Sequence, residues 1–299
     1  MELPHPHVAV IIPTYNDTRR LKRCLTALAA QSYPADRITI IVVDNGSSTP
    51  VCKEINSPRS LRCFVEQAPG SYAARNRGLA EAHQPIVAFT DSDCLPDRHW
   101  ILRGVDALLA AGDECGVVAG EVKLFFKGKS PTTIAEAYEY LFEFRYPSSQ
   151  VLRKCVTANW FSRRETIESF GGFNQGLYSN GDTELSTRIS AAGLKIMYEP
   201  SAQVYHPARH RMMLLIRKRR RLVGGDLLRH RGQRRSTSRI TLGNSAKTYF
   251  GRVRSLLTIG SADFTKSVRL KGLFALSVLF AVTVFEVIRV RAFHCTAQR

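Results

Sequence analysis

Two aspartates separated by one small residue follow a short apolar strand in the segment VAFTDSDCLPD, residues 87–97. Neighbouring carboxylates repel each other and lose hydration, so a fold tolerates Asp91 and Asp93 together where a cation or a proton shares the site. Taken alone, an acid-x-acid triplet is more often a loop with an aspartate turn. Oxygen ligands with open positions suit Mg²⁺ or Mn²⁺, which take their remaining ligands from substrate phosphates and water. The pair therefore predicts a divalent-metal site if further acids converge on it.

The elements before this pair alternate between strand and helix. Apolar, β-branched runs at residues 8–15 and 38–43 predict buried strands, and leucines recur at helical spacing between them. A strand at 63–66, a helix at 71–83 and a strand at 85–90 continue the alternation. This order predicts an α/β fold with a mostly parallel, Rossmann-like sheet that binds ligands at the carboxyl ends of its strands. Asp44, which is also a natural turn residue in DNGS, ends the second strand there.

Five ordered segments carry a family resemblance: VIIPTYNDTRRLKRCLTALAAQSYP, IIVVDNGSS, GSYAARNRGLAEA, VAFTDSDCLPDRHWI and GGFNQGLYSNGDTELSTRISAAG. In this order and spacing the chain resembles the family 2 glycosyltransferases of GT-A fold over about residues 7–207. The resemblance implies an inverting, metal-dependent enzyme of the hexosyltransferase type. It would move a sugar from a nucleotide-diphosphate sugar, a UDP-sugar in our interpretation, to a glycan or lipid-linked acceptor in cell-surface polysaccharide or glycolipid synthesis.

The resemblance also implies a donor site with Mg²⁺ or Mn²⁺ on the diphosphate. The acid pair becomes the DxD element, and a metal there acts as a Lewis acid for the departing diphosphate. His206 matches a position at which many GT-A enzymes supply a histidine ligand, although a lone histidine is as often structural. The implied metal ligands are Asp91, Asp93 and His206. The implied donor contacts are Pro13, Thr14, Tyr15, Asp44, Arg75, Asn76, Asp91, Ser92 and Asp93.

The resemblance places the general base on the aspartate that opens a helix near residue 182. An acceptor hydroxyl attacks well only when a carboxylate takes its proton, and Asp182 falls on that position. The same residue is a natural helix N-cap, and the two roles are compatible. The sequence departs from the family pattern at Gly181, where a glutamate is usual. Gly181, Asn159 and Trp160 are the implied acceptor contacts, with core packing as the alternative for Trp160.

Charge divides the chain near residue 208. The formal net charge is +18, yet residues 1–208 carry 22 basic and 22 acidic residues, so residues 209–299, with 21 basic and 3 acidic, hold the whole excess. We therefore predict a catalytic domain at 1–208 and a basic, partly helical region at 209–299. The apolar run at 270–288 has an uninterrupted core of 14 residues. It can span a membrane marginally, lie on its surface or pack as a core helix, so we predict association with an anionic membrane.

Seven scattered cysteines without a CxxC spacing argue against a disulfide framework and a thiolate zinc site. A reducing compartment follows, and the basic region places the chain on the cytoplasmic face of a membrane, peripherally or by a single span. No signal peptide is expected at the start of this sequence.

Nucleic-acid binding is not expected, because the arginine block lacks interleaved aromatics. A dinucleotide dehydrogenase needs GxGxxG after the first strand, and a nucleotidyltransferase needs a glycine-rich basic loop there; PTYND is neither. The remaining alternatives are a non-catalytic or hydrolytic homologue and a basic protein that binds anionic polymers.

Overall fold

The structure is a computed structural model that describes residues 5–55, 60–145, 151–177, 179–229, 234–258 and 264–293. The chain divides into two compact units. The first comprises Met1–Lys123, Tyr146–Gly176 and Gly181–His206, and the second comprises Leu124–Arg145, Leu177–Asn180 and Pro207–Arg299. The predicted division into 1–208 and 209–299 stays a prediction. The second unit differs from the predicted C-terminal region in that it also includes Leu124–Arg145 and Leu177–Asn180.

One mixed sheet forms the centre of the first unit. Its strands, as far as the structure describes the chain, lie in the order β3-β2-β1-β4-β8-β6-β9-β5, with β7 beside β9. The parallel half consists of β1 (Val8–Thr14), β2 (Ile38–Asp44), β3 (Leu61–Val65) and β4 (Ile86–Phe89). The antiparallel half adds β5 (Leu95–Pro96), β6 (Cys115–Phe125), β7 (Val151–Leu152), β8 (Trp160–Arg163) and β9 (Lys195–Pro207). The predicted α/β fold, with Rossmann-like parallel strands β3-β2-β1-β4, is confirmed.

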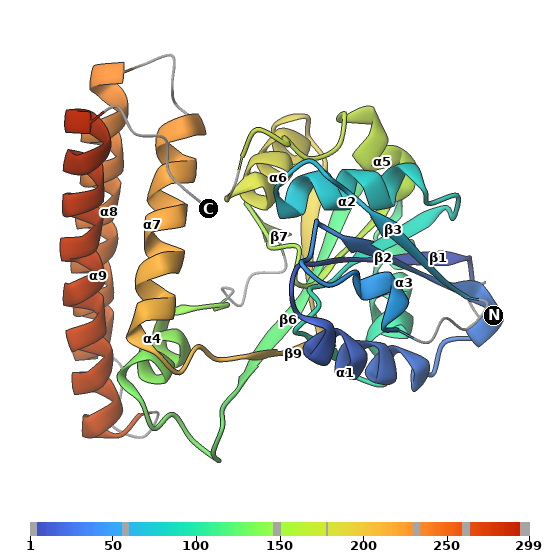
Figure 1. Ribbon diagram of the computed structural model, residues 1–299, viewed down its shortest axis with the longest axis horizontal. Coiled ribbons are helices and arrows are strands. Elements are labelled where there is room, and N and C mark those ends of the chain that lie inside the picture. The colour runs from blue at the N-terminus through green and yellow to red at the C-terminus, as the bar shows by residue number, and fades with distance from the viewer. Residues whose placement is uncertain are drawn as a thin grey trace. The chain divides into compact units, whose positions relative to one another are not determined.

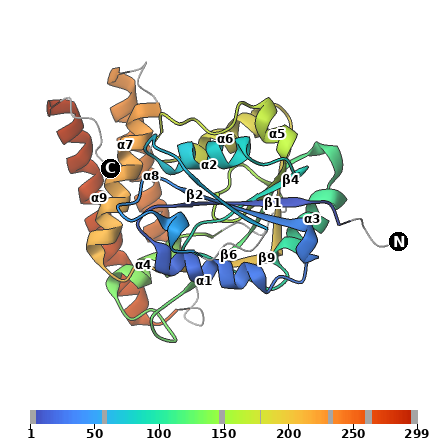
Figure 2. The same ribbon diagram turned by 45° about the vertical axis from the view of Figure 1, so that its right-hand side comes forward.

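Helices cover both faces of this sheet (Figures 1 and 2). α2 (Ser71–Ala80), α5 (Arg164–Ser169) and α6 (Gly181–Ala191) lie on one face, and α1 (Thr18–Ala29) and α3 (Trp100–Ala110) lie on the other. α2 approaches the sheet closely because Gly78 has no side chain; a Cβ there would meet Ile11 at 2.4 Å. Short 3₁₀ turns, η1 (Ala35–Arg37), η2 (Val51–Lys53) and η3 (Gly112–Glu114), complete the connections.

The central strands are apolar on both faces, which is why they are buried. Every residue of β1 is buried, and so is every residue of β4. α1 exposes its charged side chains and buries Leu21, Cys24 and Leu28, as the leucine spacing predicts. The expected alternation of strands and helices through residue 90 is confirmed, with boundaries that differ by a few residues.

The structure contains one disulfide, although the scattered cysteines argued against a disulfide framework. Cys52 in η2 and Cys63 in β3 are bonded, with Cα atoms 5.6 Å apart. The two residues are 11 positions apart in the chain, and only the return of the chain into edge strand β3 brings them together. A spacing rule tuned to CxxC motifs cannot detect such a pair. Cys24, Cys94, Cys115 and Cys155 are buried and free.

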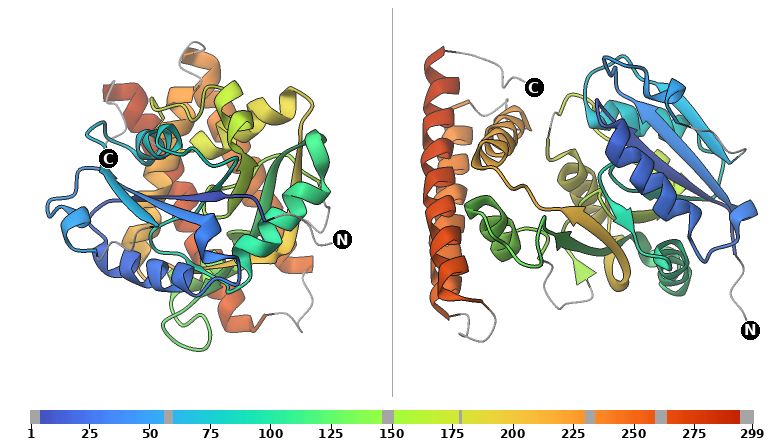
Figure 3. Two further views of the ribbon diagram at one scale, coloured as in Figure 1. Left: turned by 90° about the vertical axis from the view of Figure 1, so that its right-hand side faces the viewer. Right: turned by 60° about the horizontal axis from the view of Figure 1, so that its bottom comes forward.

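The second unit is helical. It consists of α4 (Ile134–Phe142), α7 (Met212–Arg229), α8 (Arg234–Thr258) and α9 (Lys266–Phe293). α9 runs beside α8 and contacts α4 and α7 as well (Figure 3). Its buried face meets Ala135, Tyr138 and Leu215 in an apolar cluster. A capping box of Thr133 and Glu136 fixes the start of α4.

Candidate active site

The acid pair lies in a tight turn between two strands of the first unit. β4 ends at Phe89, and the hydroxyl of the buried Thr90 donates a hydrogen bond to the carbonyl of Ala158 at 3.0 Å. Asp91 and Asp93 follow in a turn closed by the amide of Cys94, which donates to the Asp91 carbonyl at 3.0 Å. Ser92 is the small residue between the two acids. Both carboxylates are half-buried, so the turn presents them at the carboxyl end of β4, where the sequence predicted them.

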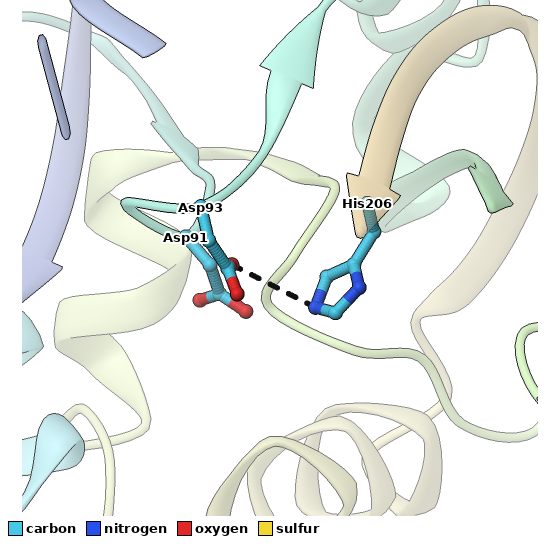
Figure 4. A group of neighbouring side chains, drawn as sticks. All are labelled: Asp91, Asp93 and His206. Carbon is cyan, nitrogen blue, oxygen red and sulfur yellow. Dashed lines mark ion pairs between the residues drawn. The ribbon is translucent and has the colours of Figure 1, made fainter. Parts of the chain in front are cut away.

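His206 reaches the acids through strand pairing. β5 runs antiparallel to β9 with Leu95 opposite Tyr205, and this register brings His206 next to the turn. The Nε2 atom of His206 lies 3.7 Å from Oδ1 of Asp93 (Figure 4). One ligand atom from each of Asp91, Asp93 and His206 lies within 4.8 Å of the others. The fold thus brings together the three residues predicted as metal ligands, although 115 positions separate the outermost two.

These three side chains fit Mg²⁺ or Mn²⁺. Two carboxylates and one imidazole form a mainly hard donor set, and they leave positions for phosphate oxygens and water. Protein cations also neutralise the acids in part. The guanidinium of Arg75, only 4% exposed, donates from Nη2 to Oδ1 of Asp91 at 2.5 Å. Nη1 of Arg20, on α1, lies 3.9 Å from Oδ2 of Asp93.

Asp182 sits in the first turn of α6. Its Oδ1 accepts hydrogen bonds from the amide of Thr183 at 2.8 Å and from the hydroxyl of Tyr72 at 3.3 Å. Burial raises the pKa of the Asp182 carboxyl, and the negative charge of Asp91 raises it further, while the Thr183 amide, Arg75 and Tyr72 act in the opposite direction. A carboxylate with a raised pKa is a better proton acceptor once it is ionised. Glu184, by contrast, uses both oxygens to hold Arg188 at 2.7 and 3.0 Å.

The predicted nucleotide contacts gather at the ends of β1 and β2. Thr14 pairs with Asp44 in the sheet register. The hydroxyl of Thr14 is buried and has no hydrogen-bond partner among the described residues. Pro13 is buried, whereas Tyr15 is 55% exposed. Asp44 serves as the turn residue that DNGS suggests, because its two oxygens accept the amides of Ser47 and Val51, each at 3.0 Å.

Asn76 supports the glycine turn before α6 through its side-chain amide. It donates to the carbonyl of Phe173 at 2.7 Å and accepts the Phe173 amide at 2.9 Å. Gly172 is required there, since its φ is +70° and a Cβ would lie 2.7 Å from the Asn76 side chain. The structure therefore gives Asn76 a positioning contact, and a donor contact at Asn76 stays a prediction.

The acceptor contacts predicted at Asn159 and Trp160 disagree with the structure. Both side chains are fully buried. Asn159 accepts the indole N–H of Trp100 at 2.8 Å and donates to the carbonyls of Glu121 and Ala202. Trp160 packs in the core, as the alternative interpretation allowed, because strand β8 is inserted between β4 and β6. The third predicted acceptor contact, Gly181, is buried beside Tyr72.

Sequence reasoning missed two side chains of the site, Tyr72 and Arg20. Tyr72 is next to small residues on α2 and has the appearance of a core aromatic, whereas its hydroxyl reaches Asp182. Arg20 belongs to a charged face of α1 that a pattern assigns to solvent. Only the packing of α1 and α2 against the sheet reveals either contact.

A mixed α/β sheet with an acid-x-acid turn at the end of β4 and an acid in the first turn of α6 is the arrangement that the resemblance to GT-A glycosyltransferases implies. Family comparison agrees: the sequence pattern described as "Glycosyl transferase family 2" matches residues 9–170. The chain belongs to glycosyltransferase family 2.

Two relatives share about a third of their residues with this chain. Glycosyltransferase AglE of Haloferax volcanii is 35% identical over 211 residues, which is 68% of this chain and 68% of AglE. The pre-mycofactocin glycosyltransferase of Mycobacterium tuberculosis is 32% identical over 219 residues, and the match covers 69% of this chain but only 43% of that protein.

Two solved structures share the fold. The mannosyltransferase PcManGT from Pyrobaculum calidifontis, in complex with GDP-Man and Mn2+, superimposes with a TM-score of 0.56 at 20% identity, covering 97% of this chain and 76% of that one. S. aureus TarS gives a TM-score of 0.51 at 19% identity and covers 74% and 40%. At such identities the likeness supports the fold.

Proposed function

We propose that this glycosyltransferase inverts the anomeric carbon as it moves a sugar from a nucleotide-diphosphate donor, a UDP-sugar, to a glycan or lipid-linked acceptor in cell-surface polysaccharide or glycolipid synthesis. One observation carries the proposal: a continuous set of contacts joins the predicted base to the predicted metal ligands. The hydroxyl of Tyr72 contacts Asp182, Arg75 lies over the Tyr72 ring at 5.5 Å, and Arg75 pairs with Asp91. These contacts support placing the acid that would accept the proton in one site with the acids that would hold the metal.

The residues of the site divide metal binding and proton transfer between them. Asp91, Asp93 and His206 would hold Mg²⁺ or Mn²⁺, which when bound supplies positive charge to the leaving diphosphate. Asp182 takes the proton of the acceptor hydroxyl while that oxygen bonds to the anomeric carbon and the bond from this carbon to the diphosphate oxygen breaks. Attack opposite the leaving group inverts the configuration. Arg75 offsets part of the negative charge that Asp91 and the diphosphate bring together.

Asp182→Asn tests the reaction most directly. The amide keeps the shape but cannot accept the proton, so we expect sugar transfer to fall by ~10²-fold or more with little change in donor affinity. Donor affinity is measured by calorimetry with Mn²⁺, and product configuration by NMR. Glu168→Gln is the matched control, because Glu168 forms an exposed helix pair with Arg164 and lies outside the site. Near-normal transfer by Asp182→Asn, or a product that retains the donor configuration, contradicts the proposal.

Metal dependence has its own test at Asp93. Asp93→Ala removes one of the two carboxylates, so we expect donor affinity in Mn²⁺ to fall at least tenfold, to the level that excess chelator produces in the unaltered protein. Full turnover of that variant, or of the unaltered protein in excess chelator, excludes the metal assignment. Release of free sugar and diphosphate in the absence of transfer to any acceptor would instead identify a hydrolytic homologue.

We also propose that the second unit contacts an anionic membrane on its cytoplasmic face. Among the described residues, one helix is long and apolar enough to cross a membrane, Lys266–Val290 of α9. Its exposed side carries large apolar residues at helical spacing: Leu270, Phe274, Phe285 and Ile288. Its buried side holds Glu286, which is 1% exposed and pairs with Arg220 at 3.0 Å and Arg289 at 2.6 Å.

This distribution is the reverse of a water-facing amphipathic helix, which would keep its charge outside. An apolar stripe together with basic residues suits a surface with apolar chains beneath anionic headgroups. We expect the Phe274→Ser, Phe285→Ser double variant to lose at least tenfold in affinity for vesicles of phosphatidylcholine and phosphatidylglycerol. Val65→Ser, which removes an exposed valine of the first unit, is the control. Equal flotation of both variants and the unaltered protein would show that the stripe does not meet the membrane.

A further inference from the structure

We propose that Tyr72 is a positioning residue for sugar transfer: its hydroxyl holds the Asp182 carboxylate in the orientation that accepts the acceptor proton. The proposal rests on the proposed role of Asp182 as general base. It adds a residue outside the acid pair and the base, and assigns a role to a side chain that has the appearance of a core aromatic in the sequence.

Two hydrogen bonds reach the same carboxylate oxygen of Asp182. The hydroxyl of Tyr72 and the amide of Thr183 both donate to Oδ1, at 3.3 and 2.8 Å. Two donors on one oxygen fix the plane of the carboxylate and leave Oδ2 to accept a proton. The Thr183 amide belongs to the same helical turn as Asp182, so Tyr72 is the donor that fixes the carboxylate relative to α2.

The Tyr72 ring is held firmly enough to serve this purpose. It is 6% exposed and stacks on Phe173 with ring centroids 5.7 Å apart and an angle of 22° between the planes. The Arg75 guanidinium covers the ring at 5.5 Å. Asn76 in turn fixes the backbone of Phe173 through two hydrogen bonds. A rigid support of this kind lowers the entropy lost when the base meets its acceptor.

The missing side chain at residue 181 makes room for this ring. A Cβ on Gly181 would lie 2.7 to 2.9 Å from three carbons of Tyr72, closer than any normal contact. The glycine is thus a condition for the observed position of Tyr72. The glycine that stands in place of the usual glutamate at 181 therefore allows Tyr72 to reach Asp182.

The protonation state of Tyr72 supports the direction of the hydrogen bond. Burial raises the pKa of the Tyr72 hydroxyl, and the negative charge of Asp182 raises it further. The phenol therefore keeps its proton at neutral pH and donates it to the carboxylate. The charged groups that face Asp182 are Arg75 and Asp91, and both remain in place when only the Tyr72 hydroxyl is removed.

A double-mutant cycle tests the proposal on the full-length protein. Tyr72→Phe keeps the ring, its stacking and its volume but removes the donor, so we expect kcat to fall about tenfold while the Kd for the nucleotide-sugar donor is unchanged, in the range expected for a hydrogen bond to a charged group. In the Asp182→Asn background, the same substitution is expected to change kcat less than about twofold, because Tyr72 acts through Asp182. Tyr33→Phe is the matched control. It removes another buried tyrosine hydroxyl, which donates to the carbonyl of Pro6 at 2.6 Å, and should leave kcat unchanged.

Two outcomes overturn the proposal without touching the proposed function. An unchanged kcat in Tyr72→Phe, or an equal loss in both backgrounds while Asp182→Asn itself is strongly impaired, shows that Tyr72 does not act through the base. Near-normal transfer by Asp182→Asn is a different result. It removes the proposed function of Asp182, and the role of Tyr72 falls with it.

Discussion

A single methyl group added at Gly181 should impair transfer by displacing Tyr72. In Gly181→Ala the new Cβ would meet three ring carbons at 2.7 to 2.9 Å, whereas carbon atoms pack best at about 3.5–4.0 Å, so the ring has to retreat by roughly 0.8 Å. The hydroxyl moves with the ring. Its bond to Asp182 is already 3.3 Å long, and a further ~0.8 Å places it beyond hydrogen-bonding distance. We expect kcat to fall about tenfold, as for Tyr72→Phe.

The same substitution should have a small effect on stability. Overpacking costs about 1–3 kcal/mol, and replacing glycine by alanine in a helix returns roughly 0.5–1 kcal/mol. The free energy of unfolding is therefore expected to fall by no more than about 2.5 kcal/mol, measured by urea denaturation alongside kcat and donor Kd. Gly251→Ala in α8 is the control, because no atom lies within 4 Å of its Cβ position and only the helix gain remains. Full activity of Gly181→Ala, or an equal further loss when it is added to Tyr72→Phe, would refute the reasoning.

Three further predictions concern pH and covalent structure. Because burial raises the pKa of Asp182, transfer should decline as pH falls through a value above the usual aspartate range, and a pH profile of kcat measures this; a decline confined to the usual range contradicts it. Glu143 is half-buried and its lost hydration raises its pKa, but Lys218 at 2.7 Å and nearby arginines lower it to about 2. Its stabilising contribution is therefore complete above the unfolded value near 4.5 and lost as pH falls toward 2, so urea titrations from pH 6 to 3 should show a loss that Glu143→Gln reduces. Cys52→Ser opens a loop of 11 residues and should lower the free energy of unfolding by up to about 3 kcal/mol, and an unaltered urea midpoint in non-reducing buffer would show that the pair does not stabilise the fold.

Local pattern was sufficient to predict the parallel half of the sheet. β1, β2 and β4 are continuous apolar runs, and each ends in a polar turn, so both the strands and the place of Asp44 and Asp91 follow from the order of residues. The approach of His206 to the acids was predicted only through family resemblance. Its physical cause is the antiparallel pairing of β5 with β9, and a strand of two residues leaves too weak a pattern to be recognised.

The roles of two aromatic side chains, Trp160 on β8 and Tyr72 on α2, could not be predicted from the sequence. Trp160 lies on a strand inserted between β4 and β6, and nothing in its neighbourhood in the sequence distinguishes a buried indole from a platform for a sugar. Tyr72 presents the opposite case, since small neighbours suggest a core position while its hydroxyl reaches an acid 110 residues away. Both outcomes depend on which helix or strand lies opposite, and that information is distributed over the whole chain.

The position of Arg75 explains how three acids coexist in this site before a donor arrives. Asp91 and Asp93 repel each other, and Asp91 also opposes ionisation of Asp182. The Arg75 guanidinium pairs with Asp91 at 2.5 Å and acts on Asp182 in the opposite sense to Asp91, so one buried cation moderates both the metal side and the base side. Its own Nε atom is buried without a hydrogen-bond partner among the described residues. Loss of the Asp91 carboxylate would leave the enclosed guanidinium without its direct charged contact, which costs about 1–3 kcal/mol. The acids that would bind the donor therefore also hold in place the first turn of α2, from which Tyr72 reaches Asp182.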